Sequence, residues 1–309
     1  MADIINLLRE KAKKKPKKIV FPEPDDERIL EAVDYIEKEK IAYPLLLTKD
    51  KLEPEKQEEF ASLFHQWKQA KGVSFEEARE LMTNPLYYAA MLVRCGYAHG
   101  IVAGAIYTTS SVIRSALNCL EIDRSIGLVS GCFIMVVPDC DYGEAGTFIY
   151  ADCGVVPYPS SEQLANIAVS SARFAKEVLE FCPRVAFLSF STKGSAGGRW
   201  VDKIREAVKI AESKDKEFSF DGELQADSAL VPEVAERKLD KSKVAGRANV
   251  LIFPNLDAGN ICYKLTERLA KARAVGPIIL GTVQPCGDLS RGCSVEDIID
   301  STVITVIRA

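Results

Sequence analysis

Residues 276–297, GPIILGTVQPCGDLSRGCSVED, join a short apolar run, a loop and the start of a helix. Residues 277–281 are apolar and end in glycine, which predicts a buried strand. Residues 282–293 have the Gly, Pro, Asp and Ser content of a sharply turning loop. Apolar residues then recur at helical spacing behind Ser294, which suits an N-cap. Strand, loop and helix in this order predict an α/β fold whose loop lies at the carboxyl end of a strand.

Three side chains give this segment a chemical character: the Ser290 hydroxyl, the Arg291 guanidinium and the Asp297 carboxylate. Loops that precede a helix N-terminus bind anions, because free N–H groups and the positive end of the helix dipole point at them. An alternative interpretation needs no ligand. Ser294 and Asp297 have the spacing of a capping box, and Arg291 then lies in solvent. The residues alone leave both interpretations open.

Length and charge limit the classes of protein to consider. A chain of 309 residues predicts two domains of about 150 residues. The 40 basic and 44 acidic residues, a net charge of −4, give no reason to expect nucleic acid or an acidic membrane as partner. The first residues predict an amphipathic helix rather than a secretory signal, and no run has the length of a membrane span. Nine scattered cysteines without a C-x-x-C pair indicate reduced thiols in a cytoplasmic protein.

Strands and helices alternate along the whole chain. Residues 50–70 are predicted to be a helical or irregular surface segment, and residues 221–227 form an acidic segment. Residues 132–138 and 147–152 predict two strands of a hairpin. The other predicted strands are 18–22, 42–48, 100–106, 185–191, 250–254 and 277–281, and the predicted helices include 25–39, 75–82, 85–97, 160–179, 201–213 and 259–272.

Two further turns follow predicted strands. The first, YTTSS, supplies the hydroxyls of Thr108, Thr109 and Ser110 ahead of a helix that carries Arg114. The second, TKGSAGG, begins at Thr192, and its glycines allow backbone amides to approach an anion. Such a turn is also a common helix cap, and the sequence does not decide between the two.

Several kinds of site have no support in the sequence. No G-x-G-x-x-G or Walker sequence follows a strand, so a nucleotide site is not indicated. The two histidines, His65 and His99, lie far apart and lack a partner at ligand spacing, so no metal site is predicted. A catalytic base would therefore be a carboxylate, and a nucleophile would come from the substrate.

Six stretches in this order resemble the phosphate acetyltransferase (phosphotransacetylase) family, and they cover nearly the whole chain. They are FPEPDDERILEA, SGCFIMVVPDCDYGEAGTFIYADCGVVPYPSSEQLANIA, FLSFSTKGSA, DGELQADSAL, NVLIFPNLDAGNICYKLTERLAKARAVGPI and DLSRGCSVEDI. The resemblance implies two α/β/α domains of the isocitrate/isopropylmalate dehydrogenase-like architecture, with the active site in the cleft between them. The implied domains are residues 1–125 with 285–309, and residues 126–284, the second of which carries the interface of a homodimer.

The resemblance also implies roles for individual residues. Asp297 takes the place of the catalytic carboxylate, and Ser290 and Arg291 take the places of the groups that stabilise the transition state. Arg114 corresponds to a further arginine of the site, preceded by the hydroxyls of residues 108–110. The residues Thr192, Lys193, Gly194 and Ser195 match the substrate-binding turn.

The chain departs from the family pattern at several positions. Lys68 stands where the family usually has an arginine, and a lysine lacks the two-pronged fork of the guanidinium. Ser115 replaces a proline, Leu280 a glutamine and Gly287 an asparagine. These departures bear on substrate affinity and specificity more than on the chemistry.

The implied activity is the reversible transfer of an acetyl group between coenzyme A and inorganic phosphate, without metal or cofactor. Two alternatives stay open: transfer of a longer acyl group, as in phosphate butyryltransferases, and a non-catalytic module that senses coenzyme A.

Overall fold

The chain forms two compact units in the computed structural model, which describes residues 4–239 and 241–309. Unit 1 comprises Met1–Ile122 and Thr282–Ala309, and unit 2 comprises Asp123–Gly281. Each unit is described by itself.

Unit 1 is built on four parallel strands in the order β2, β1, β3, β10. The strands are β1 (Lys18–Phe21), β2 (Tyr43–Leu46), β3 (Gly100–Ala103) and β10 (Cys286–Asp288). Residues 286–288 pair with residues 101–103, so the last strand of the chain lies beside a strand from its first third. Because the four strands run in one direction, all of their carboxyl ends lie at the same edge.

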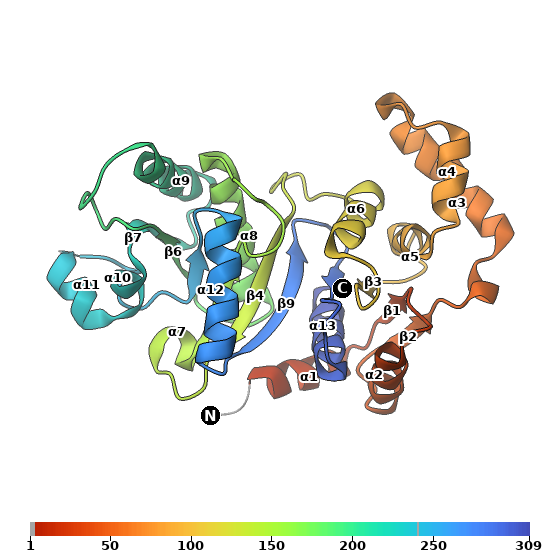
Figure 1. The fold of residues 1–309 in the computed structure, drawn as a ribbon, viewed down its shortest axis with the longest axis horizontal. Helices are drawn as coiled ribbons and strands as arrows, with labels where there is room; N and C mark the ends of the chain where they lie inside the picture. Colours follow the sequence, from red (N-terminus) through yellow and green to blue (C-terminus); the bar gives the residue numbers. More distant parts are fainter. Residues whose placement is uncertain (1–3, 240) are drawn as a thin grey trace. The chain divides into compact units, whose positions relative to one another are not determined.

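Helices cover both faces of this sheet. In Figure 1, α5 and α6 lie on one side of the strands, and α2 and α13 lie on the other. The helix α13 packs against α2, α1 and three strands, because its apolar residues recur at helical spacing and are buried. The helices of unit 1 are α1 (Ile4–Lys14), α2 (Glu27–Lys38), α3 (Pro54–Lys68), α4 (Phe75–Met82), α5 (Pro85–Arg94), α6 (Thr109–Cys119) and α13 (Val295–Arg308), with 3-10 turns at Lys49–Lys51 and Gln69–Lys71.

Unit 2 contains a mixed sheet in the order β9, β4, β5, β8, β6, β7. The strand β4 is antiparallel to both of its neighbours, whereas the pairs from β5 to β7 are parallel. The predicted hairpin is confirmed, with the short helix α7 (Tyr142–Ala145) in its connection. The strands are β4 (Ser130–Val136), β5 (Thr147–Ala151), β6 (Arg184–Leu188), β7 (Ser219–Leu224), β8 (Val250–Ile252) and β9 (Arg273–Leu280).

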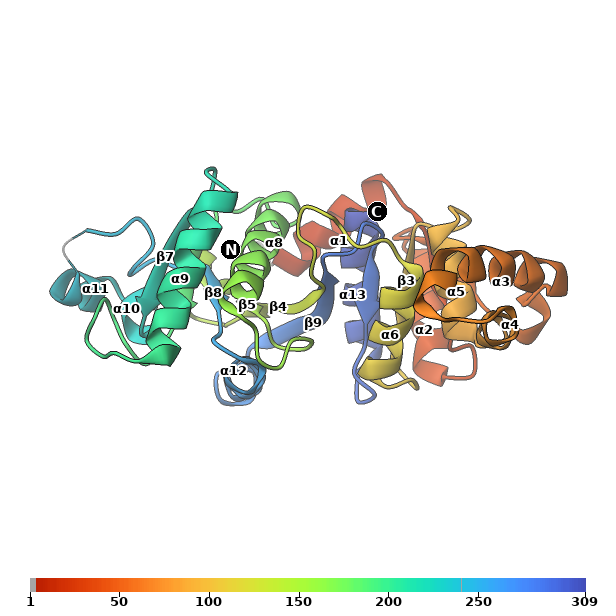
Figure 2. The ribbon, with the colours of Figure 1, turned by 90° about the horizontal axis from the view of Figure 1, so that it is seen from above.

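The helices of unit 2 also lie on two sides of their sheet. Figure 2 shows α12 on the opposite side of the strands from α8 and α9. The ring of Tyr263 on α12 stacks on that of Phe133 in β4, with centroids 4.0 Å apart. The helices are α8 (Ser161–Glu177), α9 (Arg199–Lys214), α10 (Ala226–Leu230), α11 (Pro232–Lys238) and α12 (Leu256–Leu269). The predicted α/β class is therefore confirmed in both units.

One detail of the predicted secondary structure is wrong, and one segment was left unassigned. Residues 282–293 are not one loop, because β10 lies within them; the acidic residues 221–227, for which the sequence predicted no element, contribute to β7 and α10. Both strands lack the apolar alternation that identifies a strand in sequence. In β10 a side chain at Gly287 would force Ser301 on α13 to shift, since a Cβ there would lie 2.4 Å from Oγ of Ser301. Among the described residues, no helix has the length and apolar character needed to cross a membrane.

Candidate functional site

Three loops of unit 1 meet at one edge of the sheet, where β1, β3 and β10 end. These strands are neighbours and parallel, so residues 22–26, 104–108 and 289–294 emerge side by side. The backbone N–H of Leu289 donates to the carbonyl of Ala103 at 2.8 Å. The topology thus brings together two loops that the sequence analysis selected separately.

Ser290 and Arg291 are exposed at the turn of the third loop. The backbone N–H of Gly292 donates to Oγ of Ser290 at 3.2 Å. Because this bond uses a lone pair of the hydroxyl, the hydroxyl hydrogen remains available for another acceptor. Arg291 makes no ion pair with the residues that the structure describes.

Asp297 lies in the first turn of α13 and forms the predicted capping box. Its Oδ2 accepts from the N–H of Ser294 at 2.8 Å and from the Ser294 hydroxyl at 2.9 Å, and the Asp297 N–H donates back to that hydroxyl at 3.2 Å. The side chain is exposed, and no described residue donates a hydrogen bond to Oδ1. Capping and a chemical role are therefore compatible, since one carboxylate oxygen caps the helix and the other faces solvent.

The hydroxyl turn leads into α6 as predicted. Thr108 is the N-cap, and its Oγ1 accepts from the N–H of Ser111 at 3.2 Å and lies 2.9 Å from Oγ of Ser110. Thr109 is half-buried, whereas Ser110 and Arg114 are exposed. Arg114 forms no ion pair with any described residue, so its guanidinium is free for an anion.

Lys68 is the last residue of α3 and is half-buried. Burial, together with the charge of Lys71, lowers the pKa of Lys68. Its Nζ lies 6.0 Å from the centre of the Phe64 ring. Because this ammonium group has already lost part of its hydration, the further cost of removing water when it binds a phosphate group is smaller.

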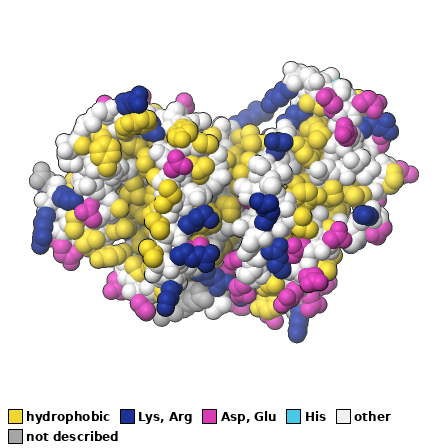
Figure 3. All heavy atoms as spheres, viewed as in Figure 1, with side chains coloured by type: hydrophobic (Ala, Val, Ile, Leu, Met, Phe, Trp, Pro, Cys, Tyr) yellow, Lys and Arg dark blue, Asp and Glu magenta, His cyan; other side chains and the backbone are white. Residues whose placement is uncertain are grey.

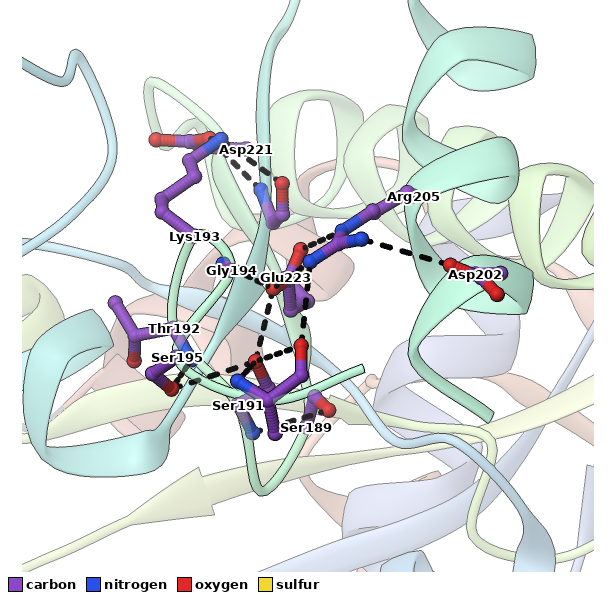
Figure 4. A network of polar contacts seen from close by, with 12 residues as sticks. Ser189, Ser191, Thr192, Lys193, Gly194, Ser195, Asp202, Arg205, Asp221 and Glu223 are labelled. Carbon is purple, nitrogen blue, oxygen red and sulfur yellow. Dashed lines mark hydrogen bonds and ion pairs between the residues drawn. The ribbon is translucent and has the colours of Figure 1, made fainter. Parts of the chain in front are cut away.

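The turn Thr192–Ser195 of unit 2 has its amides engaged inside the protein (Figure 4). The N–H of Gly194 donates to Oε1 of Glu223 at 2.8 Å, and the N–H of Thr192 donates to Oγ of Ser195 at 2.9 Å. The N–H of Lys193 donates to the carbonyl of Glu223 at 3.1 Å. The amides of the turn thus have acceptors within the protein, and the Glu223 carboxylate accepts that of Gly194.

Glu223 is the centre of this network and is 1 % exposed. Burial opposes its ionisation, but hydrogen bonds from Arg205 at 2.9 and 3.1 Å and from Gly194 lower the pKa of Glu223 to about 2. The ammonium of Lys193 pairs with Asp221 and donates to the carbonyl of Gly222 at 2.9 Å. The charges around the turn are therefore balanced within the protein.

Glu23 is a residue of the edge that the sequence analysis did not select. It follows β1, is 2 % exposed, and its two oxygens accept four backbone N–H groups, from residues 104 to 107 at 2.7–3.1 Å. The carboxylate fixes the start of the hydroxyl turn in the way that an anion fills a nest. The stretch FPEPDDERILEA, which contains it, was the only signal in the sequence.

Asp288 is a second unselected residue, fully buried at the end of β10. Neither of its carboxylate oxygens has a hydrogen-bond partner among the described residues. Burial, with a smaller contribution from the nearby Glu23, raises the pKa of Asp288 to about 7. A Cβ at Gly104, where φ is +119°, would lie 2.9 Å from Oδ1 of Asp288, so the two loops approach closely only because residue 104 is glycine.

The two histidines have local structural partners. Nδ1 of His65 lies 3.0 Å from the carbonyl of Val73, and Nδ1 of His99 accepts from the N–H of Lys18 at 3.2 Å. Within residues 4–239 and 241–309, no group of three or more His, Cys, Asp or Glu side chains is arranged to hold a metal ion.

The sequence profile described as phosphate acetyl/butaryl transferase matches residues 3–306. The chain belongs to this family. A phosphate acetyltransferase of Thermoanaerobacterium thermosaccharolyticum is 47% identical over 325 aligned positions, which cover 99% of both chains. The crystal structure of a phosphotransacetylase from Streptococcus pyogenes has a TM-score of 0.92 and 36% identity, and covers 98% of this chain and 97% of that one.

The fold of this chain also resembles that of a protein with a different described activity. A protein from Salmonella typhimurium described as a 4-hydroxythreonine-4-phosphate dehydrogenase has a TM-score of 0.51 at 15% identity and covers 95% of this chain and 99% of that one. At that identity the likeness concerns the fold alone. The phosphate acetyl/butaryl transferase chain thus has the dehydrogenase-like α/β architecture that its sequence implied.

Gly287, one of the departures from the family pattern, has a local explanation. A Cβ at this position would lie 2.4 Å from Oγ of Ser301 and 3.0 Å from Oγ1 of Thr305. In this member of the phosphate acetyl/butaryl transferase family, a side chain at residue 287 would require Ser301 and Thr305 on α13 to shift. The position supports packing beneath the loop and offers no group to a substrate.

Proposed function

We propose that the chain catalyses the reversible reaction of acetyl-CoA with inorganic phosphate to give acetyl phosphate and CoA. The observation that carries the proposal is the arrangement of Ser290, Arg291 and Asp297 on one loop and the helix that follows it. Family membership and the name of the relatives support acetyl transfer, and the exposed hydroxyl, cation and carboxylate supply the groups that the reaction needs.

In the direction of acetyl-CoA synthesis, the sulfur of CoA attacks the carbonyl carbon of acetyl phosphate. The C–S bond forms, the bond between the carbonyl carbon and the bridging oxygen breaks, and inorganic phosphate leaves with that oxygen. A thiol is mostly protonated at neutral pH, so a carboxylate must accept its proton as the sulfur attacks. We assign this role to Asp297, whose Oδ1 is not needed for the helix cap.

Negative charge develops on the carbonyl oxygen and on the departing phosphate. The Ser290 hydroxyl, which already accepts the Gly292 N–H, donates its hydrogen to the carbonyl oxygen. Arg291 and Arg114 hold the phosphate oxygens through charge-assisted hydrogen bonds, since neither is neutralised by a described carboxylate. The hydroxyls of Thr108, Thr109 and Ser110 complete the proposed phosphate contacts.

We assign the remaining predicted residues, Lys68 and Thr192–Ser195, to contacts with the phosphate groups of CoA. Lys68 supplies one of them, and the lowered pKa of its ammonium group agrees with a partly desolvated position. In unit 2 the proposed contacts of Thr192–Ser195 fall on side chains, because the amides of the turn already have partners. Lys193 would exchange Asp221 for a substrate phosphate.

The test is turnover of the purified full chain. Phosphate-dependent release of CoA from acetyl-CoA, run beside butyryl-CoA, is measured through the free thiol. The proposal expects acetyl-CoA to have the higher kcat/KM. A preference for butyryl-CoA would make the chain a longer-chain acyltransferase, and binding of CoA without any turnover would make it a sensing module.

A homodimer completes the proposal. The helix α12 exposes Ile261, Leu265 and Leu269, spaced four residues apart on one stripe, and Leu269 is 80 % exposed. Figure 3 shows hydrophobic side chains gathered over the face that carries α12. A second copy of the chain would cover this stripe. Light scattering on the chain and on Leu265→Glu should give the mass of a dimer and of a monomer respectively, whereas a monomeric parent chain would refute the dimer.

A further inference from the structure

The guanidinium of Arg28 has every one of its donors engaged at the loop edge of unit 1. Its Nε and Nη2 donate to the two oxygens of Asp26 at 3.0 and 2.7 Å. Its Nη1 donates to the carbonyls of Arg291 at 2.9 Å and Cys293 at 2.8 Å, and Nη2 also reaches the carbonyl of Ala105 at 3.0 Å. A guanidinium has five N–H donors, and five oxygen acceptors surround this one, with Sγ of Cys293 a further 3.8 Å contact of Nη1.

We propose that Arg28 is a positioning residue for acyl transfer, which fixes the main chain of residues 291–293 and thereby aims the groups of Ser290 and Arg291. The proposal rests on the proposed function, because it assigns the chemistry to that loop. Arg28 lies on α2, which packs against α13. The hydrogen bonds of Arg28 therefore connect the loop to the packed helices of the unit.

The contacts separate positioning from substrate binding. Arg114 and Arg291 are exposed and have no described carboxylate partner, as an anion-binding arginine requires. Arg28 instead donates to three carbonyls and to Asp26, and the hydrogen bonds from Arg28 lower the pKa of Asp26, which keeps that carboxylate ionised. No donor of Arg28 is left for a phosphate group.

The loop depends on Arg28 because few other hydrogen bonds from the described residues hold its main chain. The N–H of Leu289 bonds Ala103 at the start of the loop, and the N–H of Cys293 bonds the carbonyl of Ser290 within it. Arg28 joins the carbonyls of residues 291 and 293 to that of Ala105 on the neighbouring loop. A lysine has one nitrogen at the end of a flexible chain and cannot reproduce this planar fork.

The experiment compares the full chain with Arg28→Lys and Arg28→Ala. Arg79→Lys is the matched control, because Arg79 also pairs with a carboxylate, Glu58, but is about half exposed on α4. For each protein, kcat and the KM values for acetyl-CoA and phosphate are measured per folded molecule. Amide hydrogen exchange of residues 289–294 is followed in the absence of substrate.

Both Arg28 variants should lose about 10- to 100-fold in kcat, the usual effect of misplaced catalytic groups, with each KM within about threefold of the parent value. Exchange in residues 289–294 should accelerate, added guanidinium ion should partly restore Arg28→Ala, and Arg79→Lys should match the parent. An unchanged kcat per folded molecule, or a large rise in the KM for phosphate alone, would overturn the proposal. If the parent chain showed no acyl transfer, the proposed function would fail. Unchanged amide exchange of residues 289–294 in Arg28→Lys would separately refute the claim that Arg28 fixes the loop.

Discussion

Replacement of Glu23 by glutamine tests how the loop edge is held together. The carboxylate is 2 % exposed and accepts four backbone N–H groups from residues 104–107. Glutamine has one acceptor oxygen, and its NH₂ group would face two N–H donors. Two hydrogen bonds to a charged acceptor are lost at about 1.5–3 kcal/mol each, so Glu23→Gln should lower the free energy of unfolding of unit 1 by roughly 3–6 kcal/mol.

The two tryptophans allow this effect to be assigned to one unit. Trp67 lies in unit 1 and Trp200 in unit 2. In a Trp200→Phe background, urea unfolding followed by fluorescence reports unit 1. Glu31→Gln, an exposed position on α2, is the control and should change the free energy of unfolding by less than about 0.5 kcal/mol. A loss below about 1 kcal/mol for Glu23→Gln would refute the reasoning, because the four amides would not then depend on the carboxylate.

Three further predictions concern the same edge. Asp297→Asn should lose about 10²–10⁴ in kcat but little stability, because asparagine keeps an oxygen for the cap, and normal kcat with reduced stability would support capping alone. Arg291→Gln and Arg114→Gln should each raise the KM for phosphate or lower kcat by about tenfold or more in steady-state assays, whereas a loss confined to CoA affinity would assign them to the other substrate. Burial raises the pKa of Asp288 from 3.8 to about 7, so the unfolded chain ionises first and the folded chain loses stability as the pH rises through that interval. In urea titrations, the free energy of unfolding of Asp288→Asn minus that of the parent should therefore rise by about 4 kcal/mol between pH 4 and pH 8. The same difference between the two proteins at both pH values would contradict the raised pKa.

Local signals in the sequence were sufficient for the helix that follows the loop. The cap formed by Ser294 and Asp297 needs only residues three apart, and the structure confirms it. The strand β10 could not be predicted in the same way. Its sequence, C-G-D, has the composition of a turn, and it is a strand only because β3 and α13 enclose it.

The features of the site that the sequence did not predict depend on contacts between segments that are far apart in the chain. Glu23 and Arg28 act on residues 104–107 and 291–293, so their partners cannot be read from neighbouring positions. The glycine-rich turn of unit 2 had the composition of an anion nest, but Glu223 from a later strand accepts the amides of Lys193 and Gly194. The sequence indicated which segments mattered, and the paired strands determine which side chains meet.

Initial rates measured against both substrates test the central claim, direct transfer of the acetyl group, most directly. If CoA and acetyl phosphate react in one ternary complex, double-reciprocal plots should intersect. The Ser290→Ala variant should keep that pattern while losing about 10²–10³ in kcat, because a donor to the carbonyl oxygen is removed and no nucleophile is lost. Parallel lines, or an acetyl group isolated on Ser290 after incubation with acetyl-CoA alone, would contradict the account and make the serine a covalent intermediate.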